Sequence, residues 1–157
     1  MKITLVVNSE EYRVVVDPDE LLIDTLRERL SLTGSKKGCA TGDCGACTVI
    51  MEERTVTSCL VLTATASGKS VMTVEGLAVD GILHPVQQSF IDFGGVQCGY
   101  CSPGLIMTTV ALLEANSDPT NEELRTGLSG NLCRCTGYGP IFDAVRAAGR
   151  TLKNGER

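Results

Sequence analysis

The chain has 157 residues, of which 43% are hydrophobic and 21% charged, and its formal net charge is −5 at pH 7. This composition is typical of a globular protein, and it excludes a chain that is disordered throughout. The negative charge argues against a nucleic-acid partner, because phosphate binding needs clustered Lys and Arg side chains. We find no secretion signal and no apolar run near the roughly 20 residues that span a bilayer, so we expect a cytoplasmic protein without a membrane span.

The first half of the chain is predicted to form a small mixed sheet with one helix. Residues 3–7 and 12–16 are rich in strand-forming residues and flank the polar segment 8–11, which indicates a hairpin. The segment Asp17-Pro18-Asp19-Glu20 has the pattern of a helix start, with Asp17 as N-cap and Glu20 closing a capping box. Leucines at helical spacing then continue to Leu30. Further strands are expected at residues 48–51, 55–57 and 70–74.

After residue 76 the pattern changes to helices. Helical segments are expected at residues 84–93, from Pro103 to about 113, after a capping box at Thr120 and Glu123, and from Pro140 to about 152. This change of character predicts two domains, residues 1–76 and 77–157.

The eight cysteines fall into two quartets, one in each predicted domain. The first has the spacing C-x4-C-x2-C followed by a distant fourth Cys, which is typical of plant-type 2Fe-2S ferredoxins. Glycines around it permit the positive φ angles of a loop that curls around a cluster, and they let backbone N–H groups approach the sulfides. The first quartet is Cys39, Cys44, Cys47 and Cys59, and the second is Cys98, Cys101, Cys133 and Cys135.

The second quartet admits more than one interpretation on its residues alone. Cys98 and Cys101 precede a predicted helix start, and Cys133 and Cys135 share one tight turn, which suits a second cluster. Structural zinc is the main alternative, since four-cysteine sites with C-x2-C pairs bind it well. A disulfide framework and a dithiol redox site at Cys98–Cys101 are weaker hypotheses. No catalytic residue is expected, and the single histidine, His84, is interpreted as a helix cap.

Three ordered motifs resemble the iron–sulfur subunit of molybdenum hydroxylases, the xanthine oxidase family. They are residues 42–49 (GDCGACTV), 97–104 (QCGYCSPG) and 130–138 (GNLCRCTGY). The resemblance extends over nearly the whole chain and favours iron–sulfur clusters over zinc. It implies an α+β protein, with an N-terminal β-grasp 2Fe-2S ferredoxin-like domain followed by a C-terminal four-helix-bundle 2Fe-2S domain. In the first turn, Asn8-Ser9-Glu10 stands where Asn-Gly is frequent in the family.

The resemblance also implies a role in a larger complex. The second quartet would hold the cluster beside a molybdopterin, in its dinucleotide form, and the first quartet the cluster farther away. Residues matching Gln97 and Cys135 contact the pterin in family members. Electrons would pass one at a time from a large molybdopterin-binding subunit, through the two clusters, to FAD in a medium subunit or to an external acceptor.

The chain ends at Arg157, before any flavin or molybdenum domain, so it resembles the family members in which these domains are separate subunits. The assembly that this resemblance implies is a dimer of heterotrimers. The surface near Gly94-Gly95 and Tyr138-Gly139 is expected to be an interface, and the alternative is a loop that packs on its own domain. The alternative function is a free-standing ferredoxin-like electron carrier.

Overall fold

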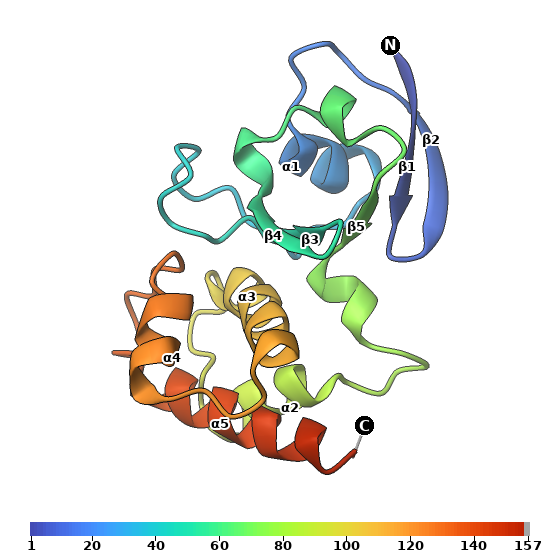
Figure 1. Cartoon of the computed structure of the whole chain (residues 1–157). Coiled ribbons are helices and arrows are strands. Elements are labelled where there is room, and N and C mark those ends of the chain that lie inside the picture. The colour runs from blue at the N-terminus through green and yellow to red at the C-terminus, as the bar shows by residue number, and fades with distance from the viewer. Residues whose placement is uncertain (156–157) are drawn as a thin grey trace.

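The computed structural model describes residues 1–155; the last two residues of the predicted second domain, Glu156 and Arg157, lie outside the described residues. A sheet with one helix forms the upper part of the molecule in Figure 1, and a group of helices forms the lower part. The α+β class and the order of the two parts are those predicted. The strands are β1 (Lys2–Val7), β2 (Glu10–Val15), β3 (Thr48–Met51), β4 (Arg54–Thr57) and β5 (Ser70–Met72), and the helices are α1 (Leu22–Asp24), α2 (Pro85–Asp92), α3 (Ser102–Ala115), α4 (Asn121–Gly127) and α5 (Gly139–Lys153).

The N-terminal hairpin closes through a turn of two residues rather than four. Asn8 and Ser9 both have positive φ angles, 52° and 69°, which is the geometry of a type I′ turn. Asparagine tolerates this conformation. The Oδ1 atom of Asn8 also accepts a hydrogen bond from the backbone N–H of Thr73 at 2.9 Å. The side chain therefore ties the hairpin to the segment that follows β5.

The strands form one mixed sheet of order β2-β1-β5-β3-β4 within residues 1–155. β1 runs parallel to β5, whereas β3 is antiparallel to both of its neighbours. Apolar side chains alternate along the strands, so that one face of the sheet packs on the helix α1. The buried residues of this core include Leu5, Val7, Leu22, Leu26, Val49 and Val71.

The predicted helix start at Asp17 is wrong. Residues 17–20 form a single turn, and Leu21 is extended and bridges to Leu62, so α1 begins only at Leu22. The helix then continues to Arg29 with wider, π-helical hydrogen bonds. One half of the expected capping box exists, since Asp17 N–H donates to Glu20 at 3.3 Å. Pairing of Leu21 with a neighbouring segment outweighs the local capping signal.

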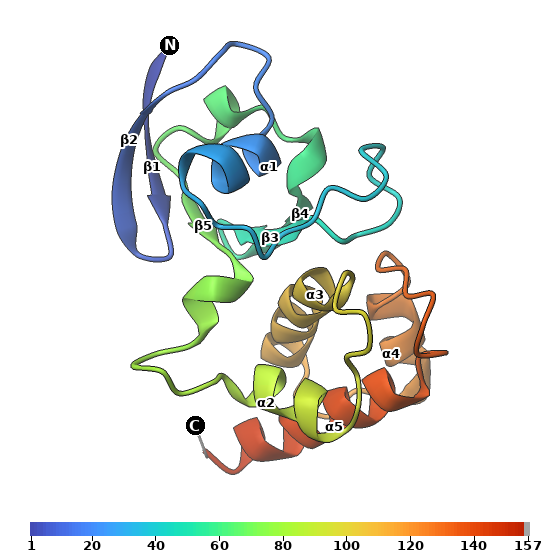
Figure 2. The ribbon, with the colours of Figure 1, turned by 180° about the vertical axis from the view of Figure 1, so that it is seen from behind.

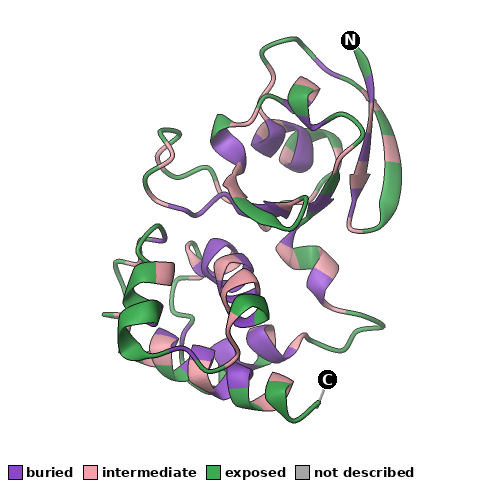
Figure 3. Ribbon diagram, in the orientation of Figure 1, coloured by how far each residue is buried: buried purple, intermediate pink, exposed green. Residues whose placement is uncertain are grey.

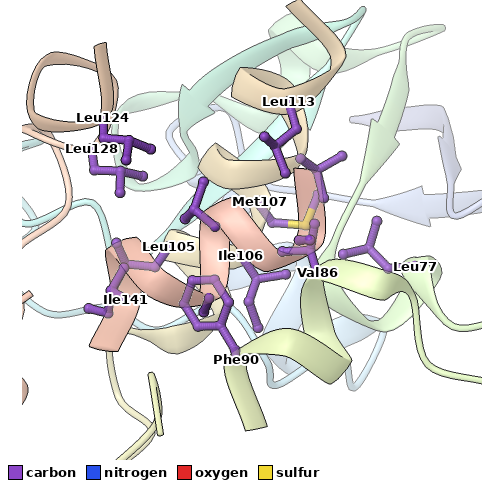
Figure 4. Packing of buried hydrophobic residues seen from close by; sticks show 14 of the residues in the cluster. Leu77, Val86, Phe90, Leu105, Ile106, Met107, Leu113, Leu124, Leu128 and Ile141 are labelled. Atoms are coloured by element: carbon purple, nitrogen blue, oxygen red, sulfur yellow. The ribbon is translucent and has the colours of Figure 1, made fainter. Parts of the chain in front are cut away.

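The helices after residue 76 match the prediction closely. His84 caps α2, with its Nδ1 accepting from the Val86 N–H at 3.2 Å, and Thr120 caps α4 in a capping box with Glu123. Figure 4 shows Phe90, Leu105 and Ile141 gathered between the helices that carry them, α2, α3 and α5. Among the described residues, no helix combines the length and apolarity needed to cross a membrane.

The two parts share buried surface. β3 is buried on both faces: Val49 packs into the core under the sheet, while Ile50 joins the core of the helices. Figure 3 shows buried residues on β3 and along the side of α3 that faces the sheet, and Figure 2 shows the same contact from behind. The sheet is thus sandwiched between α1 and α3.

Candidate iron–sulfur sites

The first cysteine group lies at one end of the sheet. Cys39, Cys44 and Cys47 belong to the loop that leads into β3, and Cys59 follows β4 in a short 3₁₀ turn, Ser58–Leu60. β3 and β4 are neighbours in the sheet, so their flanking cysteines are brought together. Cys47 and Cys59 are both buried and pack against Ile23 of α1.

Hydrogen bonds and burial act differently on these thiols. The Thr41 hydroxyl, together with the backbone N–H groups of Thr41 and Cys44, lowers the pKa of Cys39 to about 6. Both N–H groups lie 3.4 Å from Cys39 Sγ. Burial raises the pKa of Cys47 to about 11, and the adjacent Cys59 thiol adds to this shift. Cys47 can therefore ionise at neutral pH only beside a positive charge, which a bound metal supplies.

The second cysteine group lies among the helix ends. Cys98 is in the loop before α3, Cys101 caps that helix, and Cys133 and Cys135 are in the loop between α4 and α5. Burial raises the pKa of Cys101 to about 12, and the Cys133 thiol beside it adds to the shift. The pKa of Cys133 is lowered, because its own burial is outweighed by hydrogen bonds from Thr136 and Cys135. As for Cys47 in the first group, ionisation of the half-buried Cys101 thiol is favoured by a nearby cation.

The thiols of the second group are arranged in two pairs, and Cys47 adjoins Cys59 in the first group. Cys98 Sγ and Cys135 Sγ are 3.6 Å apart, and Cys101 adjoins Cys133. A tetrahedral metal held about 2.3 Å from two thiolates separates their sulfurs by about 3.8 Å, so this spacing suits one metal per pair. In residues 1–155 no three His, Cys, Asp or Glu side chains are grouped as for a single metal ion. Paired thiols fit a binuclear 2Fe-2S cluster, in which each iron takes two protein sulfurs.

A buried hydroxyl beside the second group also fits a bound cluster. Ser102 follows Cys101 at the start of α3, is 6% exposed, and its Oγ has no hydrogen-bond partner among the described atoms. A buried hydroxyl normally has a partner, because leaving it without one costs about 1–3 kcal/mol. The sulfurs of a cluster are acceptors of the required kind.

The second group has an exposed edge. Cys98 and Cys135 are exposed, whereas Cys101 and Cys133 are half-buried. Gln97 is exposed and precedes Cys98, so the structure brings it to the same edge as Cys135. In contrast, Cys47 and Cys59 of the first group are buried.

The loops of the two groups touch each other, as the left side of Figure 1 and the right side of Figure 2 show. The Leu132 N–H donates to the Cys44 carbonyl at 2.9 Å, and the buried Asn131 amide donates to the Gly45 carbonyl at 3.0 Å. The Tyr100 hydroxyl donates to the Lys37 carbonyl at 2.9 Å. Cys44 and Cys133 are thereby linked through one hydrogen bond and the backbone of Leu132.

Sequence reasoning missed the hydrogen-bonding roles of three polar residues that shape these loops. Asn131 connects the two groups, Thr136 donates to Cys133 Sγ, and the Tyr138 hydroxyl accepts from Cys133 N–H at 2.8 Å. All three lie in the third quoted motif. The usable signal was a Thr placed three residues after a ligand Cys, since Thr hydroxyls commonly bond to nearby groups in turns.

Comparisons with known proteins identify the two parts. A family model described as "2Fe-2S iron-sulfur cluster binding domain" matches residues 5–76, and one described as "[2Fe-2S] binding domain" matches residues 73–146. The nicotinate dehydrogenase small FeS subunit of Eubacterium barkeri is 50% identical, with 93% of each chain covered. The nicotine 6-hydroxylase small subunit of Paenarthrobacter nicotinovorans is 47% identical, over 98% of this chain and 93% of its own. The structure of quinoline 2-oxidoreductase from Pseudomonas putida 86 superposes with a TM-score of 0.95 at 40% identity, covering 100% of this chain and 98% of that one.

The fold, the paired thiols and these matches define an iron–sulfur protein with two 2Fe-2S binding domains. The chain belongs to the family of small 2Fe-2S subunits of molybdenum hydroxylases, which includes the nicotinate dehydrogenase, xanthine dehydrogenase and aldehyde oxidoreductase proteins. It is thus an electron-transfer subunit of an oxidoreductase complex, and the family resemblance inferred from its motifs is confirmed. The zinc and disulfide hypotheses are set aside in favour of two 2Fe-2S clusters.

Proposed function

We propose that this chain relays electrons one at a time from a large molybdopterin-binding subunit to FAD in a medium subunit or to an external acceptor. The pterin is proposed to be in its dinucleotide form, and the complex to be a cytoplasmic dimer of heterotrimers. A bound 2Fe-2S cluster supplies one-electron redox chemistry at each of the two sites. The chain's own residues hold, shield and connect these sites.

Each cluster is assigned to one part of the chain. The proposed domains are residues 1–76 and 77–157. We call the cluster of the first quartet the ferredoxin-domain cluster and that of the second the helical-domain cluster. The proposed ligands are Cys39, Cys44, Cys47 and Cys59 for the former and Cys98, Cys101, Cys133 and Cys135 for the latter.

The exposed edge of the second site supports the proposed direction. Cys98, Cys135 and Gln97 are exposed in the single chain, so a partner can approach that cluster closely. Apolar side chains lie in the same loops: Val96 is 38% exposed and Leu132 is 56% exposed. Exposed apolar residues around a redox centre suit a subunit interface. Gln97 and Cys135 are our proposed contacts with the pterin.

The contact between the two cysteine loops is the observation that carries the proposal. Cys44 accepts a hydrogen bond from Leu132, whose next residue is Cys133. The link thus joins a ligand of one proposed cluster to the neighbour of a ligand of the other. Close contact of this kind favours electron transfer between the clusters, whereas a free-standing ferredoxin-like carrier leaves the second domain without a function.

The experiment is EPR spectroscopy of the purified complex and of two variants, Cys44→Ser and Cys133→Ser. The intact complex is expected to show two distinct 2Fe-2S signals after reduction with dithionite. Each variant should lose one signal and about half of the iron. The control is Ser67→Ala, an exposed substitution away from both sites.

The order of the relay is tested by reducing the same proteins anaerobically with substrate. Candidate substrates are N-heterocycles, the class that appears in the names of the relatives above. In Cys44→Ser the helical-domain cluster should still be reduced, whereas electron delivery to an acceptor should fall. In Cys133→Ser the ferredoxin-domain cluster should stay oxidised. Its reduction by substrate there would show that the proposed order is wrong.

A further inference from the structure

The turn from Cys133 to Tyr138 is held by a closed set of hydrogen bonds. The Thr136 hydroxyl donates to Cys133 Sγ at 3.1 Å and accepts from the Tyr138 N–H at 3.2 Å. The Tyr138 hydroxyl accepts from the Cys133 N–H at 2.8 Å and donates to the Asn131 carbonyl at 3.1 Å. In this set, each hydroxyl and each N–H group therefore has a defined role as hydrogen-bond donor or acceptor.

The direction of the Thr136 proton follows from this set. A hydroxyl has one proton and two acceptor lone pairs. The Tyr138 N–H occupies one acceptor position of Thr136 Oγ1, so the proton is free to point at Cys133 Sγ. Gly137 and Tyr138 have φ angles of 65° and 69°, and these two left-handed residues turn the chain back so that the N–H reaches the hydroxyl. The turn thus orients the hydroxyl toward the sulfur.

We propose that the Thr136 hydroxyl raises the reduction potential of the helical-domain cluster by donating a hydrogen bond to Cys133. This inference rests on the proposed function, because it takes Cys133 as a ligand of that cluster. Reduction adds one negative charge, which spreads onto the cysteine sulfurs. A donor aimed at one of these sulfurs stabilises the reduced state more than the oxidised state. Thr136 is in this sense a positioning residue that contacts a ligand rather than the substrate.

The hydroxyl differs from the other donors around this sulfur. The backbone N–H groups of Cys135 and Thr136 also help to lower the pKa of Cys133, and any non-proline residue would supply them. The hydroxyl depends on which side chain stands at position 136. Substitution at this position consequently removes one donor and leaves the backbone donors in place.

The test uses the purified complex with Thr136→Val, Thr136→Ser and the control Thr151→Val. Valine keeps the shape of threonine without its hydroxyl, and serine keeps the hydroxyl. Thr151 donates to the Ala147 carbonyl within α5, so its substitution removes a hydroxyl bond that does not involve a cysteine. EPR spectra recorded at a series of poised potentials give the midpoint potential of each cluster.

We expect Thr136→Val to shift the helical-domain cluster to a lower potential and to leave the ferredoxin-domain cluster unchanged. Thr136→Ser should retain the potential of the unsubstituted protein, and Thr151→Val should change neither cluster. The proposal is overturned if Thr136→Val shifts neither cluster, shifts both equally, or is matched by Thr136→Ser. In the last case the lost methyl packing, and not the hydroxyl, would be responsible.

A Thr136 variant that loses the helical-domain cluster altogether would also test the proposal. If Thr136→Val no longer holds the second cluster, Thr136→Ala provides a second hydroxyl-free protein. Should both fail to bind it while Thr136→Ser succeeds, Thr136 acts in assembling the site, and the tuning proposal is wrong. Failure of the proposed function appears differently: the unsubstituted complex would then lack two EPR signals before any potential is compared.

Discussion

At the scale of single residues, Glu20 makes an ion pair that contributes to stability. Arg29 Nε donates to Glu20 Oε1 at 2.7 Å, and the Glu20 side chain is 11% exposed. The hydrogen bonds from Arg29 outweigh burial and, with the Thr25 hydroxyl, lower the pKa of Glu20 to about 2. A lowered pKa means that folding favours the carboxylate. This stabilisation is complete above the ordinary pKa of 4.5 and is lost as the pH falls toward 2.

Replacing Glu20 by Gln is therefore expected to destabilise the protein at pH 7 by about 1–3 kcal/mol. The difference from the unsubstituted protein should shrink as the pH falls from 4.5 toward 2, because protonation removes the same charge. The measurement is the equilibrium free energy of unfolding in urea, followed by circular dichroism at several pH values. Glu11→Gln is the control, since Glu11 forms an exposed pair with Arg13. A difference that stays constant with pH would contradict the ionic explanation.

The residues of the two sites divide into those that sequence spacing predicts and those that it does not. The first cysteine quartet was predictable, because its C-x4-C-x2-C spacing fits a loop that curls around a cluster. Spacing alone left the second quartet open between zinc and iron, and the flanking motifs favoured iron. The role of Asn131 was not predictable, because its partner Gly45 lies 86 residues away in the sequence. Contacts of this range require the packed structure.

At the scale of elements, the cap of α4 is a direct test of local sequence signals. Thr120 Oγ1 accepts from the Glu123 N–H at 3.3 Å, and Glu123 accepts from the Thr120 N–H at 2.7 Å. Thr120→Ala should lower the free energy of unfolding by about 1 kcal/mol, as expected for loss of an N-cap. Thr120→Ser, which keeps the oxygen, should be close to the unsubstituted protein. Thermal unfolding of the three proteins compares them, and equal stability of the alanine variant would argue against the cap.

The contact between α3 and the first cysteine loop depends on glycine. A Cβ at Gly104 would lie 2.1 Å from the Gly45 carbonyl oxygen, which is backbone and cannot rotate away. We expect Gly104→Ala to lower the free energy of unfolding by about 1–3 kcal/mol, the usual cost of overpacking. It should also weaken the magnetic interaction between the reduced clusters, because the two loops are forced apart.

Gly139→Ala is the matched control, at the start of another helix. A Cβ at Gly139 would meet no described atom within 4 Å, and the residue does not have a positive φ angle. Urea unfolding and EPR of the doubly reduced proteins provide the two readouts. If the two alanine variants behave alike, the close approach at Gly104 does not hold the loops together.

Local signals predicted the elements where no distant segment competed with them. The helices α2, α4 and α5 begin close to where His84, Thr120 and Pro140 indicated. The signal at Asp17 failed, because Leu21 pairs with Leu62 and delays the helix to Leu22. The same local pattern thus has different outcomes when a distant strand-like segment is available.

At the scale of the whole molecule, metal binding is expected to organise the loops rather than the cores. The cysteine loops contain few apolar side chains, whereas both cores are closed by buried Leu, Ile, Val and Phe residues. Removing the iron with a chelator should therefore leave most helical structure in place and loosen the loops.

Limited proteolysis with trypsin tests this expectation. Lys37 and Arg134 lie inside the two cysteine loops and are exposed. Cleavage after these residues should accelerate after iron removal, while cleavage after Arg13 in the hairpin should keep its rate. Equal acceleration at all three positions would indicate that the whole fold depends on the metal.

The sequence predicted two parts correctly but did not predict how closely they pack. The run Thr48-Val49-Ile50-Met51 is continuously apolar after its first residue, a pattern typical of a strand buried on both faces. Val49 and Ile50 indeed contribute to different cores. The element that covers the second face of β3 could not be inferred from the sequence. The covering helix, α3, lies about fifty residues further along the chain, and its apolar pattern does not indicate which strand it packs against.

The exposed pair Cys98 and Cys135 has a consequence for how the protein is made in the cell. Two surface thiols 3.6 Å apart are close enough to be oxidised together before any iron arrives. In the proposed complex a partner would cover that edge and block the delivery of iron to it. If the proposed complex forms, we therefore expect iron to be loaded into this site before the subunits associate.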